Sequence, residues 1–126
     1  MSAIKVRTAQ QAESAKIPES WGALNWLANA TLLGTTGQTL GRVLIAKGQN
    51  NPRHRHNRCE EVLYLLRGKL RHTVGEESVI LEAGDSLLIP AGVFHNAFSI
   101  GEEDADMIVA YPTAHRDFEP EKKPAP

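Results

Sequence analysis

The sequence predicts an all-β fold, an antiparallel sandwich or barrel, from two observations. From residue 39 onward, short apolar segments follow one another with connections too short to hold helices. Residues with turn chemistry separate these segments, including Gly84, which suits a positive φ, and the run Pro90-Ala91-Gly92. A wrap of alternating strands and helices is disfavoured, because parallel strands need long crossover connections.

Length and charge restrict the class of protein further. The 126 residues fit one domain. A net charge of −1 lacks the positive field typical of nucleic-acid binding, and the apolar run at 62–66 is far shorter than a membrane span. No apolar signal segment follows Met1, and the single cysteine, Cys59, cannot form an internal disulfide. We therefore expect a cytoplasmic protein with no nucleic-acid or membrane partner.

The first 37 residues read as an N-terminal extension that packs on the barrel or on a partner. Up to residue 17 the chain is polar and alanine-rich, with a weak helical pattern. Residues 19–30 carry Leu24 and Trp26 in an alternation typical of a strand, although a short helix fits as well. This segment is the least defined part of the predicted fold.

The barrel itself is expected over residues 38–112. Its predicted strands span residues 40–47, 61–67, 69–74, 78–81, 86–89, 95–100 and 105–111. The run Gly75-Glu76-Glu77 predicts a hairpin between the third and fourth of them. Residues 113–126 are rich in Pro, Lys and Glu, which predicts a flexible C-terminal tail.

Three histidines and one glutamate fall where a barrel would bring them together. His54 and His56 are two residues apart, so both imidazoles leave the same face of an extended backbone. Glu61 shares the face of the apolar positions 63 and 65, whereas Glu60 falls on the opposite face. A later predicted strand begins at His95, directly after the turn at 90–92. We expect four side chains to line one inner wall: His54, His56, Glu61 and His95.

These four side chains form a mixed nitrogen and oxygen donor set for a divalent first-row metal. Four protein ligands leave two positions of an octahedral ion open to water, substrate or dioxygen. In the simpler interpretation the histidines are hydrogen-bonded core residues and Glu61 is a charge at the start of a strand. Buried imidazole and carboxylate groups are costly unless paired or ligated, which favours the metal site.

Residues 40–111 resemble the cupin superfamily through two motifs. The first, Gly-x5-His-x-His-x4-Glu-x6-Gly, is met at Gly48, His54, His56, Glu61 and Gly68. The second, Gly-x5-Pro-x-Gly-x2-His-x3-Asn, is met at Gly84, Pro90, Gly92 and His95. Ser99 stands where the second motif has its Asn, but it keeps the strand parity of His95.

The resemblance implies a cupin jelly-roll β-barrel (a double-stranded β-helix) with one divalent transition metal per chain, either Mn, Fe, Ni, Zn or Cu. It implies a metal-dependent enzyme acting on a small polar metabolite, of the dioxygenase, decarboxylase or lyase, or sugar isomerase type. Two alternatives stay open: non-catalytic binding of a sugar or organic acid through the metal, and a purely structural metal. The candidate catalytic residues are Glu61 and, less favoured, His72, which could equally be a core histidine with one backbone hydrogen bond.

Small cupins are often dimers, so the resemblance also implies a homodimer. The apolar side chains at 62, 64 and 66, together with Trp21 and Trp26, suit such an interface. Filling the space between the two sheets of one barrel explains the same residues equally well.

Overall fold

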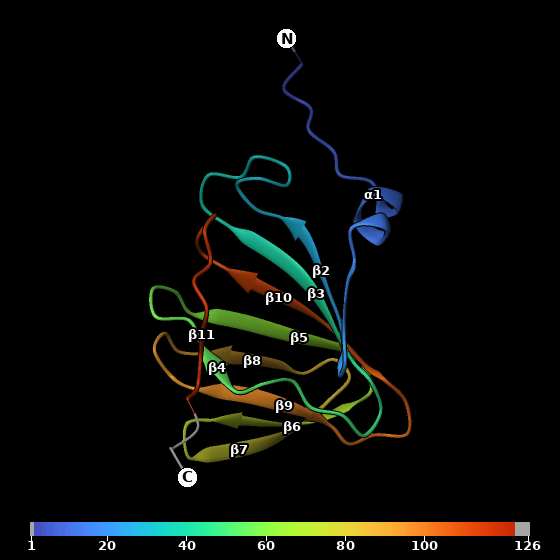
Figure 1. The fold of residues 1–126 in the computed structure, drawn as a ribbon, viewed down its shortest axis with the longest axis vertical. Coiled ribbons are helices and arrows are strands. Elements are labelled where there is room, and N and C mark those ends of the chain that lie inside the picture. Colours follow the sequence, from blue (N-terminus) through green and yellow to red (C-terminus); the bar gives the residue numbers. More distant parts are fainter. Residues whose placement is uncertain (1, 123–126) are drawn as a thin grey trace.

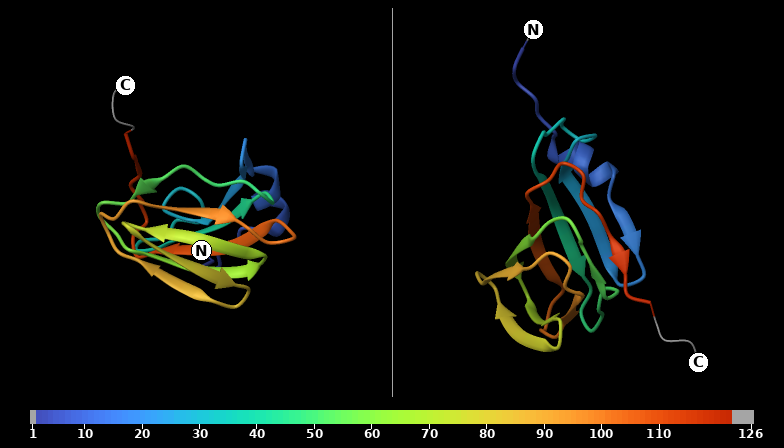
Figure 2. Two further views of the ribbon diagram at one scale, coloured as in Figure 1. Left: turned by 90° about the horizontal axis from the view of Figure 1, so that it is seen from below. Right: turned by 90° about the vertical axis from the view of Figure 1, so that its left-hand side faces the viewer.

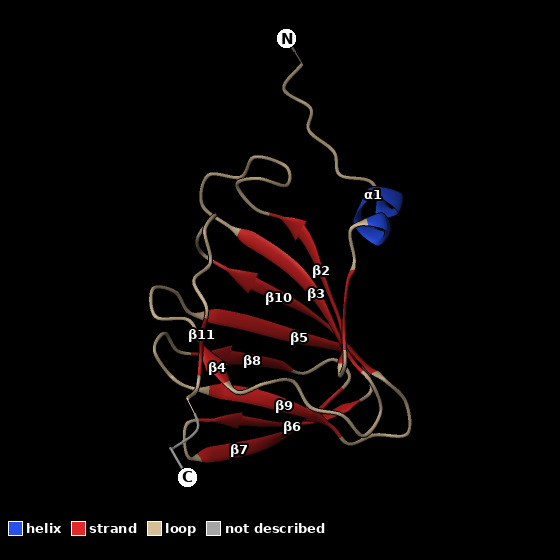
Figure 3. Cartoon of the chain, viewed as in Figure 1, coloured by secondary structure: helices blue, strands red, loops and turns tan. Residues whose placement is uncertain are grey.

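The fold consists of two antiparallel sheets and one short helix, seen in a computed structural model that describes residues 2–122 (Figures 1 and 3). In chain order the elements are α1 (Ala9–Ser14), β1 (Ile17–Glu19), β2 (Gly22–Ala28), β3 (Thr39–Ile45), β4 (His54–Arg55), β5 (Glu61–Arg67), β6 (Lys69–Val74), β7 (Glu77–Glu82), β8 (Ser86–Ile89), β9 (His95–Ser99), β10 (Ala105–Tyr111) and β11 (Glu119–Pro120). The predicted all-β jelly-roll fold is confirmed. The seven predicted strands correspond closely to β3 and β5–β10, and the structure adds β1, β4 and β11 to them and shows β2 as a strand.

The two sheets divide the chain between them. One has six strands in the order β1-β2-β3-β10-β5-β8, and the other has five in the order β11-β4-β9-β6-β7. Strands adjacent in a sheet are antiparallel throughout. Figure 2 shows the sheets wrapping around a common interior, with β4 and β9 on one side and β3, β10 and β5 on the other. The segments that carry the predicted ligands therefore reach this interior from both sheets.

Alternating side chains of each strand build the core. Leu65, Met107 and Val109 are almost completely buried between the sheets. On the opposite face of β5, Val62 and Tyr64 are 45% and 43% exposed, so this face does not fill the space between the sheets. The apolar side chains that the sequence suggested for an interface therefore differ: those at 62 and 64 are exposed, whereas Trp21 and Trp26 pack against the core. A homodimer stays a prediction.

The N-terminal residues join the main sheet. Residues 9–14 form a helix because Thr8 and Gln11 make a reciprocal capping box, with the Thr8 hydroxyl accepting from the Gln11 N–H and the Gln11 side chain accepting from the Thr8 N–H. The tryptophan segment is strand β2, not a helix, and it pairs along β3. A Cβ on Gly41 of β3 would lie 2.6 Å from the ring of Trp26, so this glycine makes room for the indole. Trp26 packs against the core of its own chain.

Two turns depend on glycine because their backbone has a positive φ. Gly84 has φ +97°, as its turn predicted. Gly68 has φ +87°, and a Cβ there would lie 2.9 Å from the carbonyl oxygen of Asp104 and from the Cα of Ala105. The glycine that closes the first motif therefore allows β5 to turn closely past the start of β10.

The C-terminal segment differs from the expected flexible tail as far as the structure describes it. Residues 113–122 run back across the barrel (red in Figure 1), and β11 pairs with β4. The pairing sets Glu119 opposite Arg55, and their side chains form an ion pair. From Glu119 onward, where the sequence has no large apolar side chain, backbone pairing and complementary charge hold the segment. Residues 123–126 of the predicted tail lie outside the described residues.

No helix among residues 2–122 has the length and apolar character needed to cross a membrane.

Candidate metal centre

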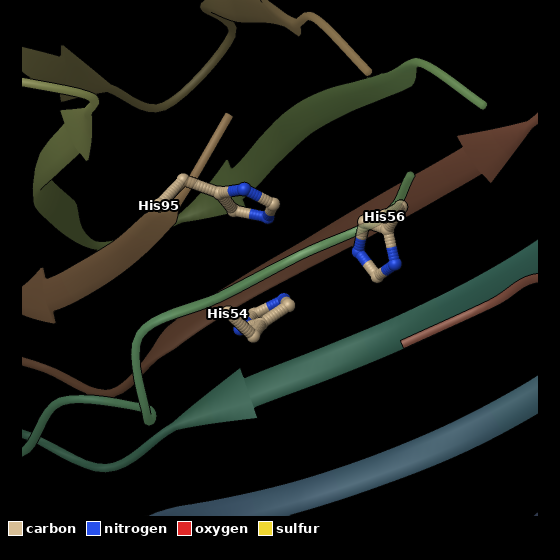
Figure 4. A group of neighbouring side chains, drawn as sticks. All are labelled: His54, His56 and His95. Atoms are coloured by element: carbon tan, nitrogen blue, oxygen red, sulfur yellow. The ribbon is translucent and has the colours of Figure 1, made fainter. Parts of the chain in front are cut away.

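Three imidazoles meet in the interior of the barrel (Figure 4). His54 in β4 lies directly opposite His95 in β9, and His56 follows two residues after His54. One ring nitrogen of each residue lies within 4.8 Å of the others. The turn at 90–92 contributes to this arrangement, because the Gly92 N–H donates to the carbonyl of His56 at 2.8 Å. The predicted convergence of the three histidines is confirmed.

The outer nitrogen of each ring is fixed by a backbone carbonyl. Nδ1 of His54 lies 2.7 Å from the carbonyl oxygen of Pro52, and Nδ1 of His95 lies 3.0 Å from that of Val93. Nδ1 of His56 lies 2.6 Å from the carbonyl of residue 117. Because a carbonyl oxygen can only accept, each Nδ1 carries the proton and each Nε2 keeps its lone pair. This is the arrangement in which proteins present histidine to a metal.

Glu61 completes the donor set from the opposite sheet. Its side chain is 5% exposed at the start of β5, and its Oε1 lies 3.2 Å from Nε2 of His56 and 3.5 Å from Nε2 of His95. Glu60 is exposed, so strand parity distinguished the two glutamates correctly. Burial by itself would raise the pKa of Glu61, but the close approach of the His56 and His95 rings, and their positive charge when protonated, lower it well below its usual value. The side chain is therefore an anionic carboxylate.

The atoms at this centre lack partners of their own. Nε2 of His56, Nε2 of His95 and Oε1 of Glu61 are all buried without a hydrogen bond among the residues described. Each such group costs about 1–3 kcal/mol if nothing satisfies it. Two ligands at right angles and about 2.1 Å from one ion lie about 3.0 Å apart, close to the separations from Glu61 given above. The donor set therefore fits a single divalent cation.

Burial keeps the first histidine neutral. The pKa of His54 is lowered to about 4, first by burial and then by the neighbouring His95. Its imidazole is thus uncharged at neutral pH, as a ligand must be.

His72 lies beside this centre and is not one of the three converging residues. It is 2% exposed in β6, and its ring stacks on that of His95 with the centroids 5.9 Å apart. Its Nδ1 lies 2.9 Å from the carbonyl oxygen of Thr73, and burial lowers its pKa to about 4. Ser99, also buried, has a hydroxyl without a partner among the described residues, so it does not reproduce the hydrogen bonds of an Asn amide.

A cavity of about 160 Å³ opens next to the donor atoms. His54, Glu61, His72 and His95 line it, and apolar side chains from both sheets form most of the remaining wall. A cavity of about this size can hold a benzene molecule. The space beside these donor atoms thus suits a small molecule.

The C-terminal segment contributes to the centre in a way that the sequence analysis missed. The carbonyl of Asp117 fixes His56, and the ring of Phe118 stacks on His54 with the centroids 4.8 Å apart. The Asp117 carboxylate accepts from the N–H groups of Asn57 and Arg58, at 2.6 and 3.1 Å. This segment therefore helps to hold both histidines of the first motif.

A charge pattern could have indicated this contact. Acidic residues recur at every second position from Asp117 through Glu119 to Glu121, and arginines do the same at 53 and 55. In the structure Glu121 pairs with Arg53, and Glu119 with Arg55. Two matching alternations of opposite sign are typical of paired strands.

Known proteins share this fold and part of the sequence. Germin-like protein 3-5 of Oryza sativa subsp. japonica is 34% identical over 87 residues, which cover 63% of this chain and 38% of the germin-like protein. A structure of oxalate oxidase in complex with the substrate analogue glycolate has a TM-score of 0.72 at 25% identity, over 78% of this chain and 54% of that one. The chain thus spans little more than a third of the length of the germin-like protein.

A further likeness shows the fold alone. A structure concerned with the Mn(II) centres of Bacillus subtilis oxalate decarboxylase has a TM-score of 0.81 at 22% identity, over 86% of this chain and 30% of that one. The model of the cupin domain family matches residues 41–111, more than half of the chain and the whole stretch that carries both motifs. The chain belongs to the cupin domain family.

Proposed function

We propose that this protein is a metal-dependent enzyme that acts on a small polar metabolite. Its metal ligands would be His54, His56, Glu61 and His95. The observation that carries the proposal is the set of buried donor atoms without partners, which converge next to a small cavity. Three imidazoles and one carboxylate accept Mn, Fe, Ni, Zn or Cu in its divalent form. The Mn(II) centres of oxalate decarboxylase make Mn(II) the first ion to test.

The residues around the cavity define what the chain itself contributes. A divalent cation supplies Lewis-acid or redox chemistry to a ligand that reaches its open positions. Glu61 places a negative charge among the imidazoles, where it would bind the metal and is also a candidate catalytic residue. His72 would be the proton acceptor, because its Nδ1–H is engaged by the Thr73 carbonyl and Nε2 keeps a lone pair. A dioxygenase, a decarboxylase or other lyase, and a sugar isomerase could all use this arrangement.

Non-catalytic capture of a sugar or organic acid through the metal is the alternative. The mostly apolar cavity wall favours it, since His72 is the buried histidine that lines the cavity besides the proposed metal ligands. Burial, together with the nearby Glu61 carboxylate, raises the pKa of Tyr111 well above its usual value, so its hydroxyl keeps its proton. An enzyme would lose turnover in a His72→Gln variant that retains its metal, whereas a binding protein has no turnover to lose.

Elemental analysis tests the metal assignment. The protein is stripped with a chelator, reloaded with each divalent ion in turn and desalted. We expect near-stoichiometric metal in the wild-type protein and little in His56→Ala and His95→Ala. Glu61→Ala should weaken the binding and Glu60→Ala should not. His115→Ala, which changes an exposed histidine outside the centre, is the matched control. Undiminished metal in the His56 and His95 variants would refute the ligand set.

A substrate screen then separates the two functions. The reloaded protein is incubated with small sugars, oxo acids, phenols, glycolate and oxalate, with and without dioxygen, and loss of substrate is measured. Turnover that disappears on removing the metal supports the enzyme. Saturable binding of one of these compounds without turnover supports the alternative.

A further inference from the structure

Arg116 lies on the wall of the same cavity, held by aromatic rings. Its guanidinium carbon is 4.3 Å from the ring centroid of Trp26 and 5.7 Å from those of Tyr111 and Phe118. Stacking of this kind fixes the plane of the guanidinium and stabilises its charge through the faces of the rings. The side chain is therefore held in place without using its hydrogen-bond donors.

Those donors have no protein partner in the part of the chain that the structure describes. Arg116 makes no side-chain hydrogen bond and no ion pair there, whereas Arg53 and Arg55 pair with glutamates. A guanidinium carries five N–H donors in a planar fork that matches the two oxygens of a carboxylate. The fork of Arg116 is thus available to a ligand.

No acidic side chain among the described residues of the cavity wall neutralises the charge of Arg116, so an anionic ligand could do so. Two acidic residues line the cavity together with Arg116, namely Glu61 and Glu19. Glu61 lies within 3.2 and 3.5 Å of two imidazoles, and Glu19 is exposed and forms no ion pair with Arg116. The rest of the cavity wall is mostly apolar and includes Leu63 and Met107. A ligand spanning this space would be anionic at one end and apolar in its body.

We propose that Arg116 binds the carboxylate of the ligand and selects small carboxylic acids over their neutral analogues. This inference rests on the proposed function in so far as the same cavity receives the ligand, and it narrows the substrate class to carboxylates. The guanidinium would form a bidentate pair with the two carboxylate oxygens, while the rest of the molecule lies toward the metal ligands.

Matched carboxylates and amides test this role by binding alone. Propionate and propionamide, and benzoate and benzamide, are titrated into the full-length protein in its Mn(II)-loaded and metal-free forms. Trp21 and Trp26 both line the cavity, so intrinsic tryptophan fluorescence reports occupancy, with calorimetry as a second readout. We expect the wild-type protein to bind at least one of the carboxylates about tenfold or more tightly than its amide, as a charge-assisted hydrogen bond implies.

Three variants identify the group responsible. Arg116→Gln should abolish most of this preference and leave the Kd of the amides within about twofold, while Arg116→Lys should retain part of it. Arg71→Gln is the matched control, because Arg71 stacks on Phe98 at 4.1 Å in the same manner but does not line the cavity. Melting temperatures of the variants confirm that each is folded.

The outcomes separate this inference from the metal proposal. A preference that disappears in Arg116→Gln supports the role of Arg116, even in samples that elemental analysis shows to be without metal. Three results overturn it: a preference that persists in Arg116→Gln, equal binding of acids and amides by the wild-type protein, or no binding of either carboxylate. Any of these, in protein that does bind Mn(II), leaves the metal site standing.

Discussion

Replacing Asp117 by alanine should weaken metal binding without changing any of the proposed metal ligands. The Asp117 carboxylate accepts two backbone N–H groups, from Asn57 at 2.6 Å and from Arg58 at 3.1 Å. These bonds fix the position of its own carbonyl, which holds Nδ1 of His56 at 2.6 Å. Loss of a group that orients a ligating histidine typically lowers metal affinity about 10–100-fold. We expect a loss near the lower figure, because the carbonyl itself remains.

The cost in stability should be small by comparison. Hydrogen bonds to a charged group contribute about 1.5–3 kcal/mol each, but the Asp117 carboxylate is close to solvent and water replaces much of this. The free energy of unfolding of the metal-free protein should fall by about 1 kcal/mol. Affinity is measured by competition with a metal-binding dye, and stability by urea denaturation. Glu121→Ala is the control, since it removes an ion pair with Arg53 in the same segment but no contact with His56. If Asp117→Ala lost stability but bound metal as tightly as the wild-type protein, the reasoning would be refuted.

Three further expectations concern stability. Metal-free protein should lose stability as the pH falls from about 6.5 to 4, because His54 and His72 bind a proton near pH 6.5 in the unfolded chain but only near pH 4 in the folded chain. The loss in the free energy of unfolding is about 3 kcal/mol for each histidine. In a pH series of urea melts, His72→Gln should remove the share of His72. Leu65→Ala should cost about 2–5 kcal/mol because the side chain is fully buried, whereas Leu66→Ala, 41% exposed, should cost less than about 1; similar losses in thermal unfolding would contradict the strand parity. Gly68→Ala should lower the melting temperature clearly, since its backbone has φ +87° and the added Cβ would meet backbone atoms at 2.9 Å; an unchanged melting temperature would count against this geometry.

The separation of Glu61 from Glu60 illustrates what a sequence pattern can predict. Alternation along an extended backbone is a local property, so the apolar partners at 63 and 65 assigned Glu61 to the interior, where it is 5% exposed. The same reasoning assigned His54 and His56 to one face. The tryptophan segment was less certain because alternation over a few residues does not distinguish a strand from a short helix. Pairing along β3 settled it as a strand.

The contribution of residues 113–122 could not be judged from composition. From Glu119 onward the segment has no large apolar residue, and it is held there by charges spaced to match Arg53 and Arg55. The value of such charges depends on a partner about 60 residues away in the chain. For the same reason, Arg116 gave no signal in the sequence beyond being one of several arginines.

By itself, the sequence predicted seven of the strands, the glycine turns and the four side chains that face one another across the barrel. Side-chain alternation and the φ preference of glycine act over a few residues, and so they can be read without knowing the fold. Only the tertiary structure decided that the C-terminal segment returns to β4. There it places a carbonyl behind His56, a ring against His54 and the guanidinium of Arg116 on the cavity wall. These contacts join distant parts of the chain, and their energy depends on where the rest of the barrel holds each partner.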